Sequence, residues 1–153
     1  MAYLNIVKEG DPILRKTSRP VEEITPRILT LLDDMKDTMH AANGCGLAAV
    51  QVGILRRVVI IEIEDGVVYE MINPRIVASS GKQEEQEGCL SVPDKWGITE
   101  RPSSVTAEYT NREGKLCRLS GEGLLARAIC HELDHLDGKL FTDVVIRYIT
   151  EEE

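Results

Sequence analysis

At 153 residues, with 42% hydrophobic and 4% aromatic residues, the chain is long enough for one domain with an aliphatic core and too short for two ordinary domains. Its formal net charge of −8 argues against a nucleic-acid partner, because proteins that bind nucleic acids concentrate Lys and Arg on one surface. No segment approaches the ~20 apolar residues of a membrane span or shows a secretory pattern. We therefore expect a cytoplasmic protein without membrane contact, whose four cysteines are thiols or metal ligands.

The first predicted element is a helix that follows Ile24 and runs to about Ala42. Thr25 can cap it, and Pro26 suits its first position. Apolar residues recur along it at steps of three and four, at Ile28, Leu31, Leu32, Met35 and Met39. We expect Gly44 to adopt the left-handed conformation that ends such a helix. This element is predicted to pack against the core.

Two antiparallel pairs of strands are predicted next. Residues 57–63 and 67–72 are rich in β-branched side chains and flank a tight Asp-Gly turn at 65–66. Residues 104–110 and 115–119 repeat this pattern. A second helix is predicted from Gly123 to Asp137, ended by Gly138. The expected fold is therefore α+β, with antiparallel sheets packed around a central helix that carries an HExxH motif.

That motif, His131-Glu132-Leu133-Asp134-His135, is the strongest chemical signal in the sequence. Residues four apart on a helix share one face, so His131 and His135 can bind one metal ion, and Glu132 can reach a water molecule beside it. The alternative is a surface helix with two histidines and an unrelated acid. Because the chain has only three histidines, two at this spacing favour a metal site.

A catalytic metal site usually has a third protein ligand. One metalloprotease class places it six residues after the second histidine, but Phe141 occupies that position here. We therefore expect the ligand upstream, with Cys89 as the best candidate, although a buried cysteine alone is ordinarily a small hydrophobic residue. Gln51 is a polar residue within an apolar, glycine-containing segment. By itself, this motif is about equally compatible with a functional amide and with a tightly packed turn that contains a satisfied glutamine.

Three segments resemble, in their order along the chain, the motifs of the peptide deformylase family. They are GLAAVQ at 46–51, EGCLS at 87–91 and HELDH at 131–135. The similarity extends from Gly10 to Phe141, and the resemblance implies a single catalytic domain over residues 1–153. It implies that the protein is a monomer that removes the formyl group from N-formylmethionyl nascent polypeptides and releases formate.

The resemblance also implies a role for individual residues. Cys89, His131 and His135 would hold one divalent metal ion, with Fe²⁺ as the expected ion and Zn²⁺ or Ni²⁺ able to substitute. Glu132 would be the general base and acid.

Other residues would bind the substrate. Gln51 and the backbone N–H of Leu90 would hold the oxyanion, and Gly46 and Gly88 would pair with the substrate main chain. The methionine side chain is expected in an apolar pocket bordered by Cys45, Leu124, Ala128 and the helix near His131.

Three other readings remain at this point. A metal-dependent endopeptidase is disfavoured by the missing downstream ligand. A structural metal site would need a fourth ligand from Cys130 or Asp134, and each projects away from its neighbouring histidine. A binding protein without catalysis is disfavoured by the presence of Glu132 and Gln51.

Overall fold

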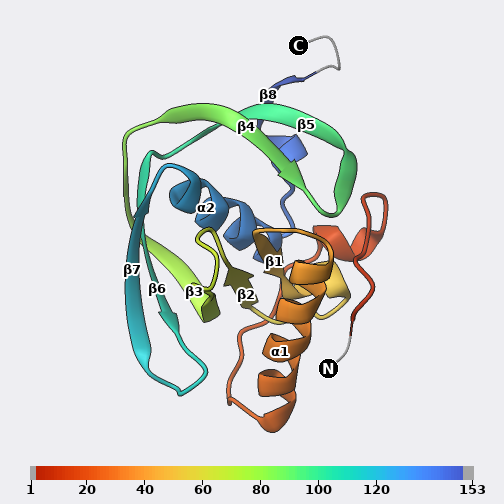
Figure 1. Cartoon of the computed structure of the whole chain (residues 1–153), viewed down its shortest axis with the longest axis vertical. Coiled ribbons are helices and arrows are strands. Elements are labelled where there is room, and N and C mark those ends of the chain that lie inside the picture. Colours follow the sequence, from red (N-terminus) through yellow and green to blue (C-terminus); the bar gives the residue numbers. More distant parts are fainter. Residues whose placement is uncertain (1–2, 150–153) are drawn as a thin grey trace.

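The computed structural model of the chain describes residues 3–149, in which two antiparallel sheets enclose a central helix (Figure 1). The α-helices of this part are α1 (Pro26–Ala41) and α2 (Leu124–Leu136), and the 3₁₀ helices are η1 (Pro12–Arg15), η2 (Ala49–Val52) and η3 (Phe141–Asp143). One sheet has the order β1 (Gly46–Ala48), β2 (Val58–Ile61), β3 (Tyr69–Ser80), β6 (Ser104–Thr110) and β7 (Leu116–Glu122). The other has the order β4 (Gln83–Cys89), β5 (Val92–Arg101) and β8 (Val145–Tyr148). The predicted α+β class is confirmed.

Helix α1 begins as the sequence predicts and ends differently. The Thr25 hydroxyl accepts a hydrogen bond from the N–H of Ile28 at 3.4 Å. At the other end, Asn43 and not Gly44 takes the left-handed conformation, with φ of 56°. Asn tolerates this region, so the prediction for Gly44 was wrong. Gly44 instead packs closely on Leu90: a Cβ there would lie 2.7 Å from Leu90 Cδ1, so the Leu90 side chain would have to shift.

Strand β2 shows how one short run of branched residues serves two cores. Val59 and Ile61 belong to the cluster between the larger sheet and α2, whereas Val58 and Ile60 belong to the cluster under α1. Successive side chains of a strand point to opposite faces, so a continuous apolar run is buried on both sides. The central part of this sheet is thus covered by a helix on each face.

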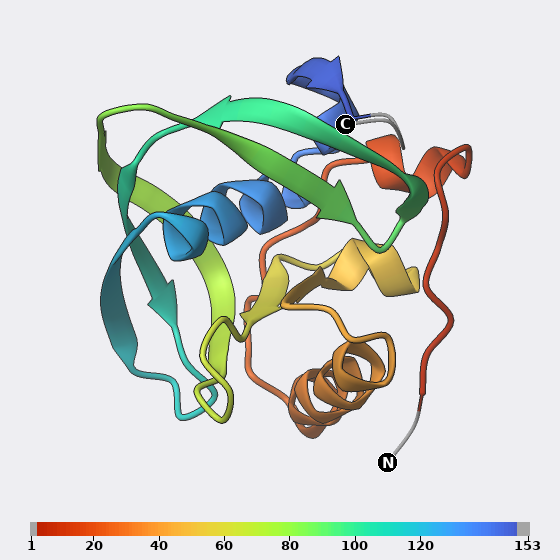
Figure 2. The same ribbon diagram turned by 45° about the horizontal axis from the view of Figure 1, so that its top comes forward.

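Helix α2 lies between the two sheets, below β4 and β5 in the view of Figure 2. Most of its residues are buried, including the polar Arg127, His131, Glu132 and His135. It ends as predicted, with Gly138 at φ of 76°. No helix within residues 3–149 is long and apolar enough to cross a membrane.

Both predicted strand pairs are present, with differences at their ends. Strands β2 and β3 pair from Val58–Ile72 to Ile61–Tyr69, so residues 62–68 form a longer connection than predicted. The predicted Asp-Gly turn is present within it, where the N–H of Val67 donates to the Glu64 carbonyl at 2.9 Å. The Glu62 carboxylate accepts the N–H of Gly66 at 2.7 Å, which stabilises this loop. The polar segment before Cys89, for which the sequence predicts no strand, is strand β4. It lies at a sheet edge, and its polar residues, of which Glu84, Glu85 and Gln86 are exposed, hide the strand pattern.

Candidate active site

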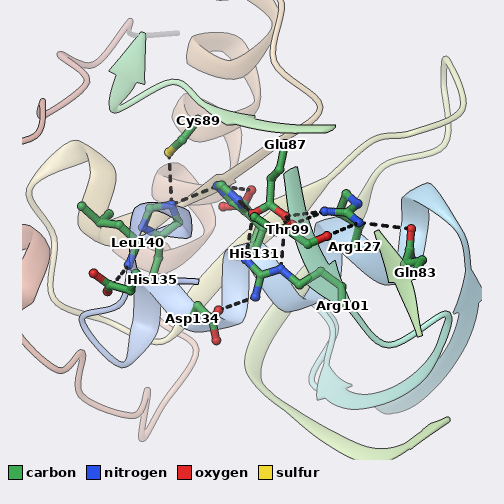
Figure 3. A network of polar contacts seen from close by, with 12 residues as sticks. Gln83, Glu87, Cys89, Thr99, Arg101, Arg127, His131, Asp134, His135 and Leu140 are labelled. Carbon is green, nitrogen blue, oxygen red and sulfur yellow. Dashed lines mark hydrogen bonds and ion pairs between the residues drawn. The ribbon is translucent and has the colours of Figure 1, made fainter. Parts of the chain in front are cut away.

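The three predicted metal ligands come together where the end of β4 meets α2. His135 Nε2 lies 3.4 Å from Cys89 Sγ and 3.3 Å from His131 Nε2. The three ligand atoms all lie within 4.8 Å of one another (Figure 3). One thiolate and two imidazoles suit zinc and iron alike, so this donor set fits a single divalent ion.

The Glu87 carboxylate forms a hydrogen bond with His131 at Nδ1, the ring nitrogen that is not directed at the other two ligand atoms. His131 Nδ1 lies 2.6 Å from Glu87 Oε2, and both side chains are buried. A carboxylate in this position keeps the proton on Nδ1 and leaves Nε2 free for a metal. The sequence analysis noted Glu87 only as part of a motif and assigned it no role.

Glu87 is also the centre of a buried polar network that joins strands β4 and β5 to helix α2 (Figure 3). Its carboxylate accepts hydrogen bonds from Arg101 at 2.7 and 3.1 Å, from Arg127 at 2.8 Å and from Thr99 at 2.7 Å. Arg101 also pairs with Asp134 on α2 at 2.7 Å. Burial raises the pKa of Glu87, but the hydrogen bonds from His131 and Arg101 outweigh burial and hold this pKa well below its usual range. Glu87 is therefore ionised at neutral pH.

The network also bears on the proposed fourth ligands. Asp134 is engaged by Arg101, and Cys130 packs in the hydrophobic core on α2. Burial raises the pKa of Cys130, so its thiol stays protonated. Neither residue contributes to the group formed by Cys89, His131 and His135. All four cysteines of the chain lie in the described part, and none of them forms a disulfide there.

The surroundings shift the pKa values of the two histidines in opposite directions. Burial lowers the pKa of His131, but the negative charge of Glu132 and the hydrogen bonds with Cys89 and Glu87 outweigh burial and raise this pKa well above the usual value. Burial and the neighbouring His131 lower the pKa of His135 well below the usual value. A metal ion therefore competes with a proton mainly at His131, because a ligand imidazole must be unprotonated at the bound nitrogen.

Glu132 lies beside this group on the same helix. Its Oε2 is 4.0 Å from His131 Nε2, and its Oε1 is buried without a hydrogen-bond partner among residues 3–149. Burial raises the pKa of Glu132 to about 7. A Cβ at Gly46 would lie 2.6 Å from Glu132 Oε2, so only glycine leaves room for the carboxylate there.

A pocket of about 400 Å³ opens next to these groups. It is lined by nearly all the predicted site residues: Cys45, Gly46, Gln51, Gly88, Cys89, Leu90, Leu124, Ala128, His131 and Glu132. His135 is fully buried behind it. The sequence analysis missed Trp96, which also lines the pocket and pairs with Gly88 across β4 and β5. A Cβ at Gly88 would lie 2.6 Å from the Trp96 ring, so glycine permits this packing.

Gln51 is a satisfied glutamine that also faces the pocket. Its Oε1 accepts the N–H of Ala48 at 2.9 Å. Its Nε2 donates to Ser91 Oγ at 3.1 Å and lies 3.6 Å from Cys89 Sγ. The structure thus shows a satisfied glutamine whose residue also lines the pocket.

Comparison with known proteins identifies the family. A family model described as polypeptide deformylase matches residues 3–149. The chain belongs to this family. The peptide deformylase of Acetivibrio thermocellus is 56% identical over 100% of this chain and 89% of its own length, and that of Caldicellulosiruptor bescii is 54% identical over 100% and 92%. The crystal structure of a peptide deformylase from Legionella pneumophila has a TM-score of 0.92 at 42% identity and covers 94% of this chain and 86% of that chain.

Membership of the deformylase family establishes the reaction class. The chain is a metal-dependent hydrolase of protein synthesis that removes N-terminal formyl groups from nascent peptides. The endopeptidase, structural-metal and binding-only readings are thereby set aside.

Proposed function

We propose that Cys89, His131 and His135 hold the metal ion of this deformylase, and that the ion is Fe²⁺, with Zn²⁺ or Ni²⁺ able to replace it. The observation that carries the proposal is that the three ligand atoms converge within 4.8 Å at the pocket that contains Glu132. When bound, a divalent ion there polarises the formyl oxygen and lowers the pKa of the attacking water.

Glu132 moves the proton. Its carboxylate accepts a proton as water attacks the formyl carbon and then delivers it to the leaving peptide nitrogen. The raised pKa of about 7 supports this role, because a general base works best when its pKa is near the operating pH.

Gln51 and the backbone N–H of Leu90 stabilise the negative charge that develops on the formyl oxygen. The Gln51 side chain and Leu90 both line the pocket, and Leu90 lies in the turn between β4 and β5. Each such donor contributes about 2.7–4 kcal/mol in other enzymes that stabilise an oxyanion.

The substrate main chain adds to the edge of the smaller sheet. Strand β4 is an edge strand, and its last residues, with Gly46 opposite, line the pocket. Gly88 and Gly46 pair with the peptide as in strand addition. The methionine side chain occupies the part of the pocket bordered by Cys45, Leu124 and Ala128.

The same proposal describes the protein as one catalytic domain over residues 1–153. It acts as a monomer in the cytoplasm on N-formylmethionyl nascent chains, without direct contact with nucleic acid or membrane. The net charge of −8 supports the part that concerns nucleic acid, since phosphates repel an acidic surface.

The test is formate release from a formyl-Met peptide by the purified protein loaded with Fe²⁺, Zn²⁺ or Ni²⁺ in turn. We expect release with each metal, fastest with Fe²⁺, and no cleavage of internal peptide bonds. Lack of formate with all three metals would contradict the proposed centre, and equal or faster release with Zn²⁺ would contradict the assignment of iron.

A further inference from the structure

Ser91 is a fully buried polar residue beside the active site that the mechanism above does not use. It has 0% exposure and lies with Leu90 in the two-residue turn between Cys89 of β4 and Val92 of β5. Its side chain is not part of the pocket lining. Any effect of its hydroxyl on the reaction must therefore pass through a neighbour.

That neighbour is the Gln51 amide, whose orientation is determined by its contacts. The N–H of Ala48 can only donate, so the atom 2.9 Å from it is the oxygen Oε1. Nε2 therefore points toward Ser91 Oγ at 3.1 Å and Cys89 Sγ at 3.6 Å. An amide NH₂ is planar, so with one N–H held by Ser91, the other points toward Cys89 Sγ and thus toward the side of the proposed metal centre, where the formyl oxygen would bind.

The backbones of the two residues are held by the same N-terminal segment. The N–H of Val7 donates to the Gln51 carbonyl, and the N–H of Glu9 donates to the Ser91 carbonyl, both at 2.7 Å. Figure 2 shows this segment, in red, passing beside η2 and the turn between β4 and β5. The distance between Ser91 and Gln51 is thus maintained by backbone as well as side-chain contacts.

We propose that Ser91 is a positioning residue for deformylation: its hydroxyl oxygen holds one N–H of Gln51 and thereby directs the other N–H toward the formyl oxygen. The inference rests on the proposed oxyanion role of Gln51. It goes further by assigning the orientation of that donor to a residue that does not contact the substrate.

The first measurement is the steady-state kinetics of Ser91→Ala. Because the donor remains but is no longer directed, we expect kcat to fall about 10-fold, less than the roughly 100-fold expected for removing an oxyanion donor in Gln51→Ala. KM should stay unchanged, since the interaction develops only in the transition state. Ser103→Ala is the matched control, because the Ser103 hydroxyl also makes one hydrogen bond, at 3.2 Å to the Ser80 carbonyl, away from the pocket. This control should keep full activity.

A double-mutant cycle separates positioning from a general structural role. If Ser91 acts through Gln51, the double variant should be no slower than Gln51→Ala alone, whereas independent effects would multiply. An NMR spectrum gives a readout without turnover: the two Nε2 protons of Gln51 should be distinct and exchange slowly in the parent protein and lose this protection in Ser91→Ala. Should Ser91→Ala fold poorly, Ser91→Cys, with a weaker acceptor of similar size, takes its place in each measurement.

The outcomes distinguish the two proposals. Full activity of Gln51→Ala would overturn both the oxyanion role and the positioning role. A slow Gln51→Ala together with a fully active Ser91→Ala, or multiplying effects in the double variant, would overturn only the role of Ser91.

Discussion

Glu87 and Glu132 are two carboxylates of one site, each 4% exposed, whose pKa values move in opposite directions. Glu87 accepts hydrogen bonds from Arg101, Arg127 and His131, and these favour its charged form over the cost of burial. Glu132 has no such cationic hydrogen-bond donor within residues 3–149, so burial raises its pKa to about 7. Glu87 is thus suited to orient the metal ligand His131, and Glu132 is suited to exchange a proton.

Replacing Glu132 by Gln should abolish turnover and leave the metal bound. The amide cannot transfer the proton, and loss of a general base typically lowers the rate by about 10²–10⁴-fold. Metal content and formate release measured on the same preparation check this. A variant that remains active within a few-fold, or that loses its metal, would show that the assigned role is wrong.

Replacing Glu87 by Gln should weaken metal binding. His131 loses a charged partner on Nδ1, and such changes typically lower metal affinity by about 10–100-fold. Competition with a chelator measures the affinity, and Glu84→Gln, at an exposed position of the same strand, is the control. An affinity equal to that of the control would contradict the role of Glu87.

The same substitution should change stability in a pH-dependent way. Because the pKa of Glu87 is lower in the folded protein than in the unfolded chain, its stabilising effect is complete above the unfolded pKa of about 4.3 and is lost as the pH falls toward the folded pKa. Glu87→Gln should therefore be less stable than the parent protein at pH 7, and the difference should shrink below about pH 4. Urea unfolding of both proteins at pH 7 and below about pH 4 measures this. A stability difference between parent and variant that grows in acid would contradict the prediction.

At the scale of elements, the end of α2 is held by a close backbone approach. Gly138, three residues after His135, has φ of 76°, and a Cβ there would lie 2.5 Å from the Arg15 carbonyl oxygen. Gly114 has a similar φ of 79° and nothing within 4 Å of the Cβ position. Comparing substitutions at Gly138 and Gly114 therefore separates the cost of the left-handed conformation from the cost of the steric contact.

Gly138→Ala should destabilise the protein more than Gly114→Ala. The left-handed conformation alone costs about 1–2 kcal/mol for a residue with a side chain, and the backbone contact adds to this only at Gly138. We expect a difference of roughly 2 kcal/mol in the free energy of unfolding, measured with urea. Equal losses of stability in the two variants would show that the contact with the Arg15 carbonyl is relieved at no cost.

At the scale of the whole molecule, the site forms where the two sheets close on α2. The smaller sheet contributes Cys89, the helix contributes both histidines, and η2 contributes Gln51. The far edge of the smaller sheet is β8, which ends at Tyr148. Glu151 to Glu153 follow outside the described residues.

We expect no ribosome binding that depends on the acidic residues 151–153. Phosphates of ribosomal RNA repel carboxylates, so deletion of residues 150–153 should leave co-sedimentation with ribosomes unchanged. The full chain and the deletion variant are compared at the same salt concentration, because such binding depends steeply on salt. Co-sedimentation that disappears on deletion would contradict the prediction.

The sequence by itself determined the elements whose signals are local. Thr25 and Pro26 predict the start of α1, and the spacing of His131 and His135 places both on one face of α2. The same holds for the strands paired as β2–β3 and β6–β7, where branched or alternating side chains flank turn residues. The convergence of Cys89 with the histidines was expected from the resemblance of its motif, not from spacing along the chain.

Tertiary structure alone decided which distant polar residues meet. Glu87, Arg101 and Arg127 are far apart in sequence, and only the pairing of β4 with β5 over α2 brings them together. Strand β4 itself has no clear sequence pattern, because an edge strand with exposed polar side chains does not need alternating apolar residues. The opposite pKa shifts of Glu87 and Glu132 follow from these contacts, since burial acts on both carboxylates but only one receives two guanidinium groups.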